Sequence, residues 1–266
     1  MSFRPIVPAP GLAGWHFLQR TQVEQLAAFS GSAWAKRDGA YFLERIGQVR
    51  NAADLVSDRR LLAVALGAFG LVDDLDNRAF IRKVLEDGTS SPDALANRLT
   101  DRRYRRLSEA FGFGPAQVPK TGDAKRMAAV LDLSRATDFE TAVGEQDESM
   151  RIALYAQREL TTLARGAGSD DAKWFSVMGL PPLRAMFETA LGLPRGFGQI
   201  DIDQQLQVFR DRTGAAIGQS GIAQFADPAQ LERLTSLYMA RTQINASGGA
   251  HSSGAIALTL LQAGSG

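Results

Sequence analysis

Apolar residues recur at helical spacing along most of the chain. Through residues 17–29, 41–49 and 55–69 they lie three or four positions apart, which places them on one face of an α-helix. Alternating apolar and polar runs, which are typical of half-buried β-strands, are scarce. The pattern therefore predicts an all-α protein, folded as an irregular bundle of about ten helices.

Capping residues divide the first part of this pattern into helices. Asp76 is expected to cap a helix that ends at Gly88, and Ser91 followed by Pro92 predicts the start of another. Asp101, or the threonine before it, is expected to open the next helix.

A T-x-x-E capping box is formed by Thr137 and Glu140. It predicts that the longest helix begins there and runs to about residue 164, where glycines end it. Shorter helices are expected after it, at about 170–177, 181–191, 201–212 and 227–242.

Composition separates the two ends of the chain from its centre. Residues 1–12 are rich in Pro and Gly, and residues 245–266 are rich in Gly and Ser, so a flexible arm and a flexible tail are expected. Within the tail, residues 255–261 form a short apolar segment that can dock into a groove or pack on its own domain. A single helical domain is expected over 13–244.

A weak internal repeat relates two parts of this domain at a separation of about 126 residues. Each part contains an apolar helix end and a Gly-Leu pair, which begins at Gly70 in one and at Gly192 in the other. Two helices that begin at Asp follow in each. This similarity is consistent with a duplicated unit, with halves near 41–113 and 170–242. It is equally consistent with unrelated helices that share ordinary capping residues.

Charge and composition exclude several classes of protein. The 266 residues include 30 basic and 29 acidic side chains, and the net charge of +1 gives no electrostatic argument for nucleic acid or an anionic membrane. There is no Cys and there are only two His, which excludes disulfides, thiolate nucleophiles and cysteine zinc sites. No catalytic residues, metal site or cofactor are predicted.

The sequence also bears on location. Prolines and glycines interrupt the N-terminal segment, so no Sec signal peptide is expected. No stretch reaches the roughly 20 apolar residues of a membrane-spanning helix. We therefore expect a soluble protein.

The densest chemical feature is the run of residues 101–106, DRRYRR. Its guanidinium groups can bind phosphate or carboxylate in a bidentate manner. On a helix, Tyr104 and Leu107 share one face and are expected to pack inward, which leaves the arginines on a solvated or partner-facing surface. Nearby acidic residues also permit pairing within the chain. The candidate partner-binding residues are Arg102, Arg103, Tyr104, Arg105 and Arg106.

The stretch from Tyr41 to Phe113 carries an ordered set of motifs. They are Asp58-Arg59 before an apolar helix, Ala68-Phe69-Gly70-Leu71, Phe80 with Lys83-Val84-Leu85-Glu86, Asp101-Arg102-Arg103-Tyr104, and Ala110-Phe111-Gly112-Phe113. With these motifs the chain resembles an alphaproteobacterial family known as domain of unknown function 1217, whose members are typically encoded among flagellar genes. The second half of the chain resembles it loosely.

This resemblance implies an all-helical fold and a role in flagellar assembly, export or motility, and it brings no catalytic residues. The leading hypothesis is a non-enzymatic structural or protein-interaction protein whose partner is a flagellar component. Such a protein is expected to be cytoplasmic or exported to the bacterial flagellum. A helical regulatory or nucleic-acid-binding protein that uses the arginine helix on phosphates is the alternative. An acid–base enzyme is a third, because carboxylates need no sequence motif to act.

Overall fold

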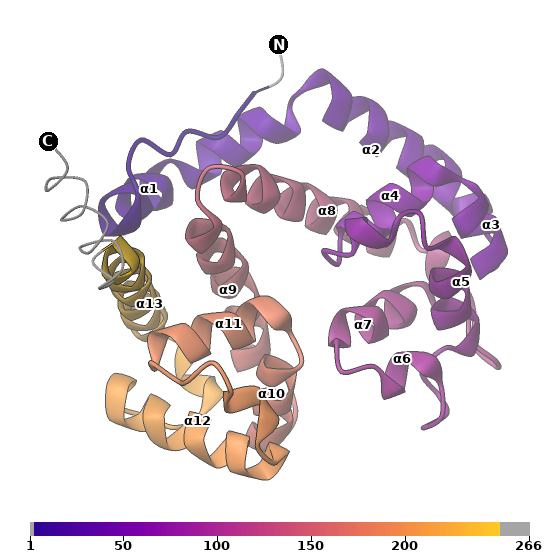
Figure 1. Ribbon diagram of the computed structural model, residues 1–266. Helices are drawn as coiled ribbons and strands as arrows, with labels where there is room; N and C mark the ends of the chain where they lie inside the picture. Colours follow the sequence, from indigo (N-terminus) through magenta and orange to yellow (C-terminus); the bar gives the residue numbers. More distant parts are fainter. Residues whose placement is uncertain (1–2, 251–266) are drawn as a thin grey trace, which may run out of the picture.

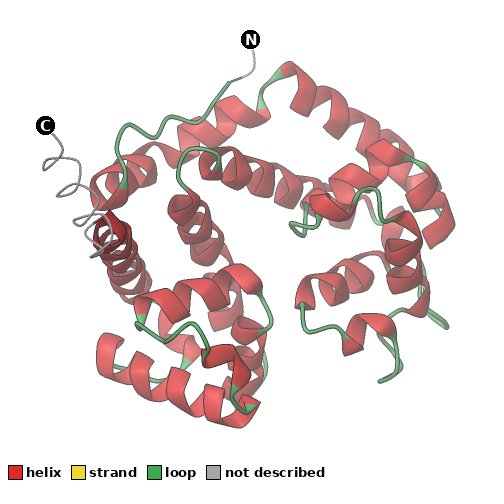
Figure 2. Ribbon diagram, viewed as in Figure 1, coloured by secondary structure: helices red, strands yellow, loops and turns green. Residues whose placement is uncertain are grey.

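The computed structural model describes residues 3–250. Within this range the chain forms thirteen α-helices and five short 3-10 helices, with no β-strand (Figure 1). Figure 2 shows the helices joined by loops throughout. The predicted all-α, irregular bundle is therefore confirmed. Among the described helices, none is both long and apolar enough to cross a membrane.

The helices form two lobes, each with its own hydrophobic core, and one long helix passes from the first core to the second. Lobe A contains α2 (Ala33–Arg45), η1 (Ile46–Gln48), α3 (Ala52–Ser57), α4 (Arg59–Gly67), η2 (Val72–Asp74), α5 (Arg78–Asp87), α6 (Leu95–Arg98), α7 (Arg102–Phe111) and η3 (Lys120–Gly122). Lobe B contains α1 (Gly11–Ser30), α9 (Glu148–Arg165), α10 (Asp170–Met178), α11 (Pro181–Ala190), η4 (Phe197–Gln199), α12 (Ile202–Ile217), η5 (Ile222–Ala226) and α13 (Pro228–Ala250). The shared helix is α8 (Ala124–Gly144).

Helix α8 joins the lobes because its two ends belong to different cores. Leu131 packs into the core of lobe A, whereas Phe139 packs into that of lobe B. Lobe B is rich in aromatic contacts; the rings of Trp174 and Phe209 stack with centroids 5.8 Å apart. Burial of such large apolar side chains is the main driving force for each core.

Aspartate caps begin several of the helices. Asp58 accepts hydrogen bonds from two backbone N–H groups of α4, and Asp101 accepts one from Arg103 at the start of α7. These caps satisfy N–H groups that have no partner within the helix. The helix predicted to begin at Asp101 is therefore confirmed, as are the four shorter helices that follow residue 170, which correspond to α10 to α13.

The capping box predicted at Thr137 is wrong. Thr137 lies inside α8, and the chain breaks only after Gly144; Asp147 then caps α9 through the N–H groups of Ser149 and Met150. The predicted long helix is therefore divided between α8 and α9, and α13, with 23 residues, is the longest described helix. Threonine and glutamate at this spacing do not start a new helix here, because α8 continues through them, with one half packed in each core.

Two other predicted helix starts also differ from the structure. Asp76 does not cap α5, because its carboxylate pairs with Arg59 instead; the helix ends at Gly88 as predicted. Ser91 accepts a hydrogen bond from the N–H of Asp93, and this forms a local turn rather than a helix start. The helix that follows, α6, has only four residues.

The segment expected to be a flexible arm lies against the first helix over its described part. The backbone N–H of Ile6 donates to Oε1 of Gln25 at 2.6 Å, and the amide of Gln25 donates back to the carbonyl of Ile6 at 3.2 Å. Pro5 is buried. Tertiary contacts therefore give this Pro-rich segment specific partners on α1.

At the other end, α13 continues to Ala250, past the expected domain boundary at residue 244. The predicted apolar segment at 255–261 and the second histidine, His251, lie outside the described residues. Whether the segment docks on a partner or on its own domain therefore remains a prediction.

The proposed halves fall in different lobes, with residues 41–113 in lobe A and 170–242 in lobe B. Their Gly-Leu turns share one geometry. Gly70 and Gly192 have φ of +68° and +65°, and the next residue in each donates its N–H to the carbonyl five positions earlier at 2.9 Å. This is the hydrogen bond of a Schellman helix end, which is common among unrelated helices, so duplication remains a prediction.

A close crossing of two loops fixes the far end of lobe A. Gly88 has φ +65° and ψ −150°, a conformation that is almost exclusive to glycine, and a Cβ atom there would lie 2.7 Å from the Cα of Gly114. The loop after α5 and the loop after α7 therefore approach each other as closely as two backbones can.

We expect the substitution Gly88→Ala to lower the free energy of unfolding by about 2–3 kcal/mol, because it adds both backbone strain and a steric clash. The measurement is urea unfolding followed by circular dichroism. The matched control is Gly47→Ala, where a Cβ atom has no neighbour within 4 Å and no loss of stability is expected. Equal stabilities for the two variants would contradict the role of this crossing.

Candidate functional site

Helix α7, which carries the predicted arginine cluster, lies at the junction of the two lobes. Leu107 and Phe111 on one face are fully buried in the core of lobe A. At the start of the helix, the backbone N–H of Arg102 donates to the carbonyl of Gly179 in lobe B at 2.9 Å. The side chains of the cluster are therefore distributed around a helix that touches both lobes.

Arg106 connects α7 to α9 through a buried network of charges. Its guanidinium pairs with Glu159, which also accepts from Arg158 at 2.7 Å, and Arg158 pairs in turn with Glu140 of α8 at 3.0 Å. Both glutamates have 6% of their surface exposed. Burial alone would lower the pKa of Arg158, but the two carboxylates raise it, so this guanidinium stays charged.

Arg103 and Tyr104 are also used inside the molecule. Arg103 donates to the carboxylate of Asp101 at 2.7 Å and to the carbonyl of Gly70. The hydroxyl of Tyr104 donates to Asp74 at 2.6 Å. Burial, followed by the hydrogen bond to Asp74, raises the pKa of Tyr104 to about 12. Tyr104 therefore packs inward as predicted and stays neutral at physiological pH.

Arg102 and Arg105 are the members of the cluster that face outward. Arg105 is exposed and pairs with Glu109 one helical turn away, at 2.8 Å. The stem of Arg102 lies on Gly179, and its guanidinium makes no hydrogen bond or ion pair with any described residue. The five predicted residues therefore do not form one surface: three hold the structure together and two line its exterior.

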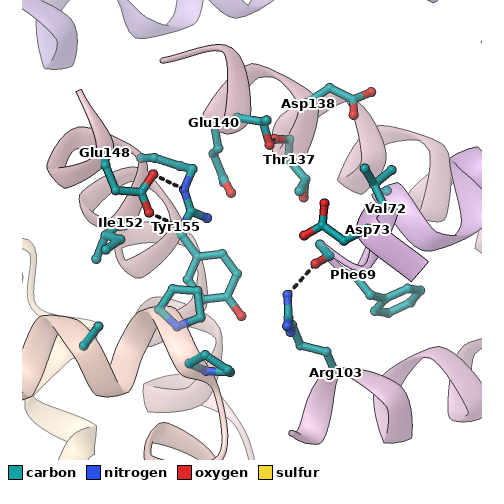
Figure 3. Close-up of a pocket in the computed structure, with 17 residues that line it drawn as sticks. Phe69, Val72, Asp73, Arg103, Thr137, Asp138, Glu140, Glu148, Ile152 and Tyr155 are labelled. Carbon is teal, nitrogen blue, oxygen red and sulfur yellow. Dashed lines mark hydrogen bonds and ion pairs between the residues drawn. The ribbon is translucent and has the colours of Figure 1, made fainter. Parts of the chain in front are cut away.

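A cavity of about 510 Å³ lies between the lobes on the other side of α7. It is lined by the link after α4 and by α7, α8, α9 and α11. Figure 3 shows Arg103 entering from lobe A and Tyr155 from α9. Burial, the larger effect, and the charge of Glu159 raise the pKa of Tyr155, so this phenol is neutral as well.

Asp138 is the unusual group at the edge of this cavity. Its carboxyl has no hydrogen bond or ion pair with a described residue, and burial, together with the charge of Asp38, raises its pKa to about 6. The neighbouring Oγ1 of Thr137 is also buried without a hydrogen-bond partner in the described structure. An acid with this pKa can exchange a proton near neutral pH.

The sequence did not single out the charged groups of this junction. Glu140, Arg158 and Glu159 come from two helices, and no local motif links them. Asp138 was concealed within the supposed capping box. The one signal in the sequence was the arginine cluster, because four arginines within five residues of a helix point in different directions, and some of them must face other parts of the protein.

Comparisons with known proteins give a family and a fold. A family model described as "Protein of unknown function (DUF1217)" matches residues 68–231. A crystal structure of protein AGR_C_984 from Agrobacterium tumefaciens is similar, with a TM-score of 0.72 and 24% sequence identity over 91% of this chain and 99% of that chain. At this identity the likeness shows the fold alone. No curated protein matches the sequence.

Removing Arg158 tests the buried network. The substitution Arg158→Met takes away the partner of Glu140 and one of the two partners of Glu159, so we expect a loss of about 3 kcal/mol in the free energy of unfolding. The control is Arg126→Met, because Arg126 is 47% exposed and lies 3.7 Å from Asp123; its loss is expected to stay below about 0.5 kcal/mol. Similar urea midpoints for both variants would rule out the network as a stabilising link.

Asp138 gives a pH-dependent prediction. Its pKa is raised on folding from an ordinary value near 3.8, so the folded chain binds the proton more tightly, and stability falls as the pH rises from about 4 to about 6. We expect Asp138→Asn to raise the free energy of unfolding by about 2 kcal/mol at pH 7.5 and to change it little at pH 4. A gain of equal size at both pH values would show that the charge of Asp138 is not the cause.

Proposed function

The chain belongs to the DUF1217 family of proteins of unknown function, and on that basis we propose that it is a non-enzymatic protein-interaction protein associated with the bacterial flagellum. The observation that carries the interaction part is the outward position of Arg102 and Arg105 at the junction of two lobes. The flagellar part is supported by the resemblance of residues 41–113 to a family whose members are typically encoded among flagellar genes.

Arginine favours protein interfaces for a physical reason. Its planar guanidinium can form paired hydrogen bonds with carboxylates, and it is less strongly hydrated than an ammonium group. Arg102 is half-buried and has no partner among the described residues, so it has already lost part of its hydration without gaining an ion pair there. A partner that supplies the missing acceptor therefore restores a favourable interaction.

Nucleic-acid binding by the same helix has less support. Arg103, Arg105 and Arg106 are all paired with carboxylates of this chain, so phosphates would have to displace Asp101, Glu109 and Glu159. The net charge of +1 adds no long-range attraction.

An acid–base enzyme is a second candidate, favoured by one observation. Asp138 combines a pKa of about 6 with a place on the cavity between the lobes. A shifted carboxyl also arises from burial without chemistry, and the phenol of Tyr155 in the same cavity stays neutral. We therefore place this candidate after the interaction protein.

Deletion of the gene tests the proposal directly. We expect the deleted strain to swim less far in soft agar than the wild type and to assemble fewer or abnormal flagella, because a required component is missing. The wild-type gene on a plasmid is expected to restore both, and the Arg102→Ser, Arg105→Ser double variant is expected to restore neither.

The control is the Arg82→Ser, Arg126→Ser double variant, which likewise removes two arginines, here exposed and ion-paired ones, and is expected to restore swimming. Circular dichroism and thermal melting of the purified variants establish that both fold. Normal flagella and swimming in the deleted strain would reject the flagellar role. Full rescue by the Arg102, Arg105 variant would reject the surface.

A further inference from the structure

A groove lies beside the first turn of α7, between α6 and α7 of lobe A and α10 to α12 of lobe B. Its volume is about 240 Å³, and it is separate from the cavity that contains Asp138. We name it the arginine groove. It is defined here by Arg102, Arg105, Phe175, Met178, Arg184 and Ile202.

The charge of this groove has one sign. Two arginines come from α7 and the third, Arg184, from α11, and none of the described residues that line the groove is acidic. Arg105 and Arg184 each pair with a glutamate on their own helix, and Arg184 also donates to Gln205 at 2.7 Å. Arg102 has no such partner within residues 3–250.

The surroundings of Arg102 leave its guanidinium without an ion pair among the described residues, although the charge of Glu109 acts on it from a distance. Burial is the largest effect that lowers its pKa, and the neighbouring Arg105 and Arg106 lower it further. Its stem is held against Gly179, and the N–H of its own backbone bonds across the lobes. The guanidinium is therefore held in place by its stem and offers its donors to whatever enters the groove.

The groove also has an apolar wall, beside the polar side chains of Asn97 and Thr100. Met178 is buried and Phe175 is half-buried at its base, whereas Ile202 at the rim is 46% exposed. The volume is below the roughly 300–1,000 Å³ of most small-molecule pockets, so a side chain fits better than a nucleotide or a cofactor. A bare phosphate ion would satisfy the arginines and leave the apolar wall unused.

We propose that the arginine groove binds an acidic segment of a protein partner, with an Asp or Glu carboxylate on Arg102 and an adjacent apolar side chain against Phe175 and Ile202. This inference rests on the proposed function, since it names the chemistry of the partner. Opposite charge selects the carboxylate, and the apolar wall distinguishes a peptide from a free anion.

Selection of phage-displayed 12-residue random peptides on the full-length protein tests this inference. We expect the selected peptides to be enriched in Asp or Glu beside Leu, Ile or Phe. The affinity of a selected peptide is expected to fall by about 10-fold in Arg102→Gln, which corresponds to the loss of one charge-assisted interaction. Replacement of the peptide's acidic residue by its amide is expected to have a similar effect.

Two further variants separate charge from fold. Arg82→Gln removes an exposed arginine of α5 and is expected to leave peptide binding unchanged, whereas Ile202→Ser is expected to weaken it. Inorganic phosphate and succinate are titrated alone as probes of a small-anion site. If they bind at Arg102 while no acidic peptide is selected, the protein-partner assignment is overturned.

Selection without acidic enrichment, or undiminished binding to Arg102→Gln, also overturns the inference. The outcome is distinguishable from that of the swimming experiment. If acidic peptides bind the groove but the gene is dispensable for flagella, the binding site is supported and the flagellar role is rejected. If the deleted strain has abnormal flagella but no acidic peptide is selected, the flagellar role is supported and the acidic-segment site is rejected.

Discussion

The ion pairs between Arg106, Glu159, Arg158 and Glu140 determine how the two lobes meet. They join α7 of lobe A to α9 of lobe B and to the shared helix α8, and their two carboxylates are almost fully removed from water. Buried charges are costly unless every partner is present, so the network favours one relative position of these helices over others. Helix α8, which packs into both cores, is the second link between the lobes.

The position of α7 has consequences on both of its sides. Arg103 lines the cavity and Arg106 pairs with Glu159, whereas Arg102 and Arg105 line the groove together with Arg184. The contact of α7 with lobe B therefore borders two openings, the cavity lined in part by Asp138 and the arginine groove. Arg103 and Arg106 are engaged inside the protein, and Arg102 and Arg105 are the members of the cluster that line the groove.

Stability and function make different demands on this junction. Asp138 has no ion pair with a described residue, and its raised pKa means that its charge opposes folding at neutral pH. Arg102 is likewise held near other positive charges. Residues that are retained at a cost to stability are candidates for function, and both of these lie next to an opening in the surface.

Much of the fold could be predicted from the sequence, because helix formation depends on local signals. Apolar spacing indicated the all-α class, and Asp101 and Gly88 marked ends of α7 and α5 correctly. Thr137 and Glu140 gave a false signal, since a capping box is also an ordinary sequence within a helix whose two halves are buried in separate cores.

The roles of residues 102–106 could be assigned only from the tertiary structure. The sequence identified the cluster and showed that Tyr104 and Leu107 share a face. It could not show that Arg106 meets Glu159, 53 positions away, or that Arg102 lies beside Phe175 without a partner in the described part of the chain. Ion pairing depends on distances between helices, and those distances are set by the packing of two cores rather than by any local pattern.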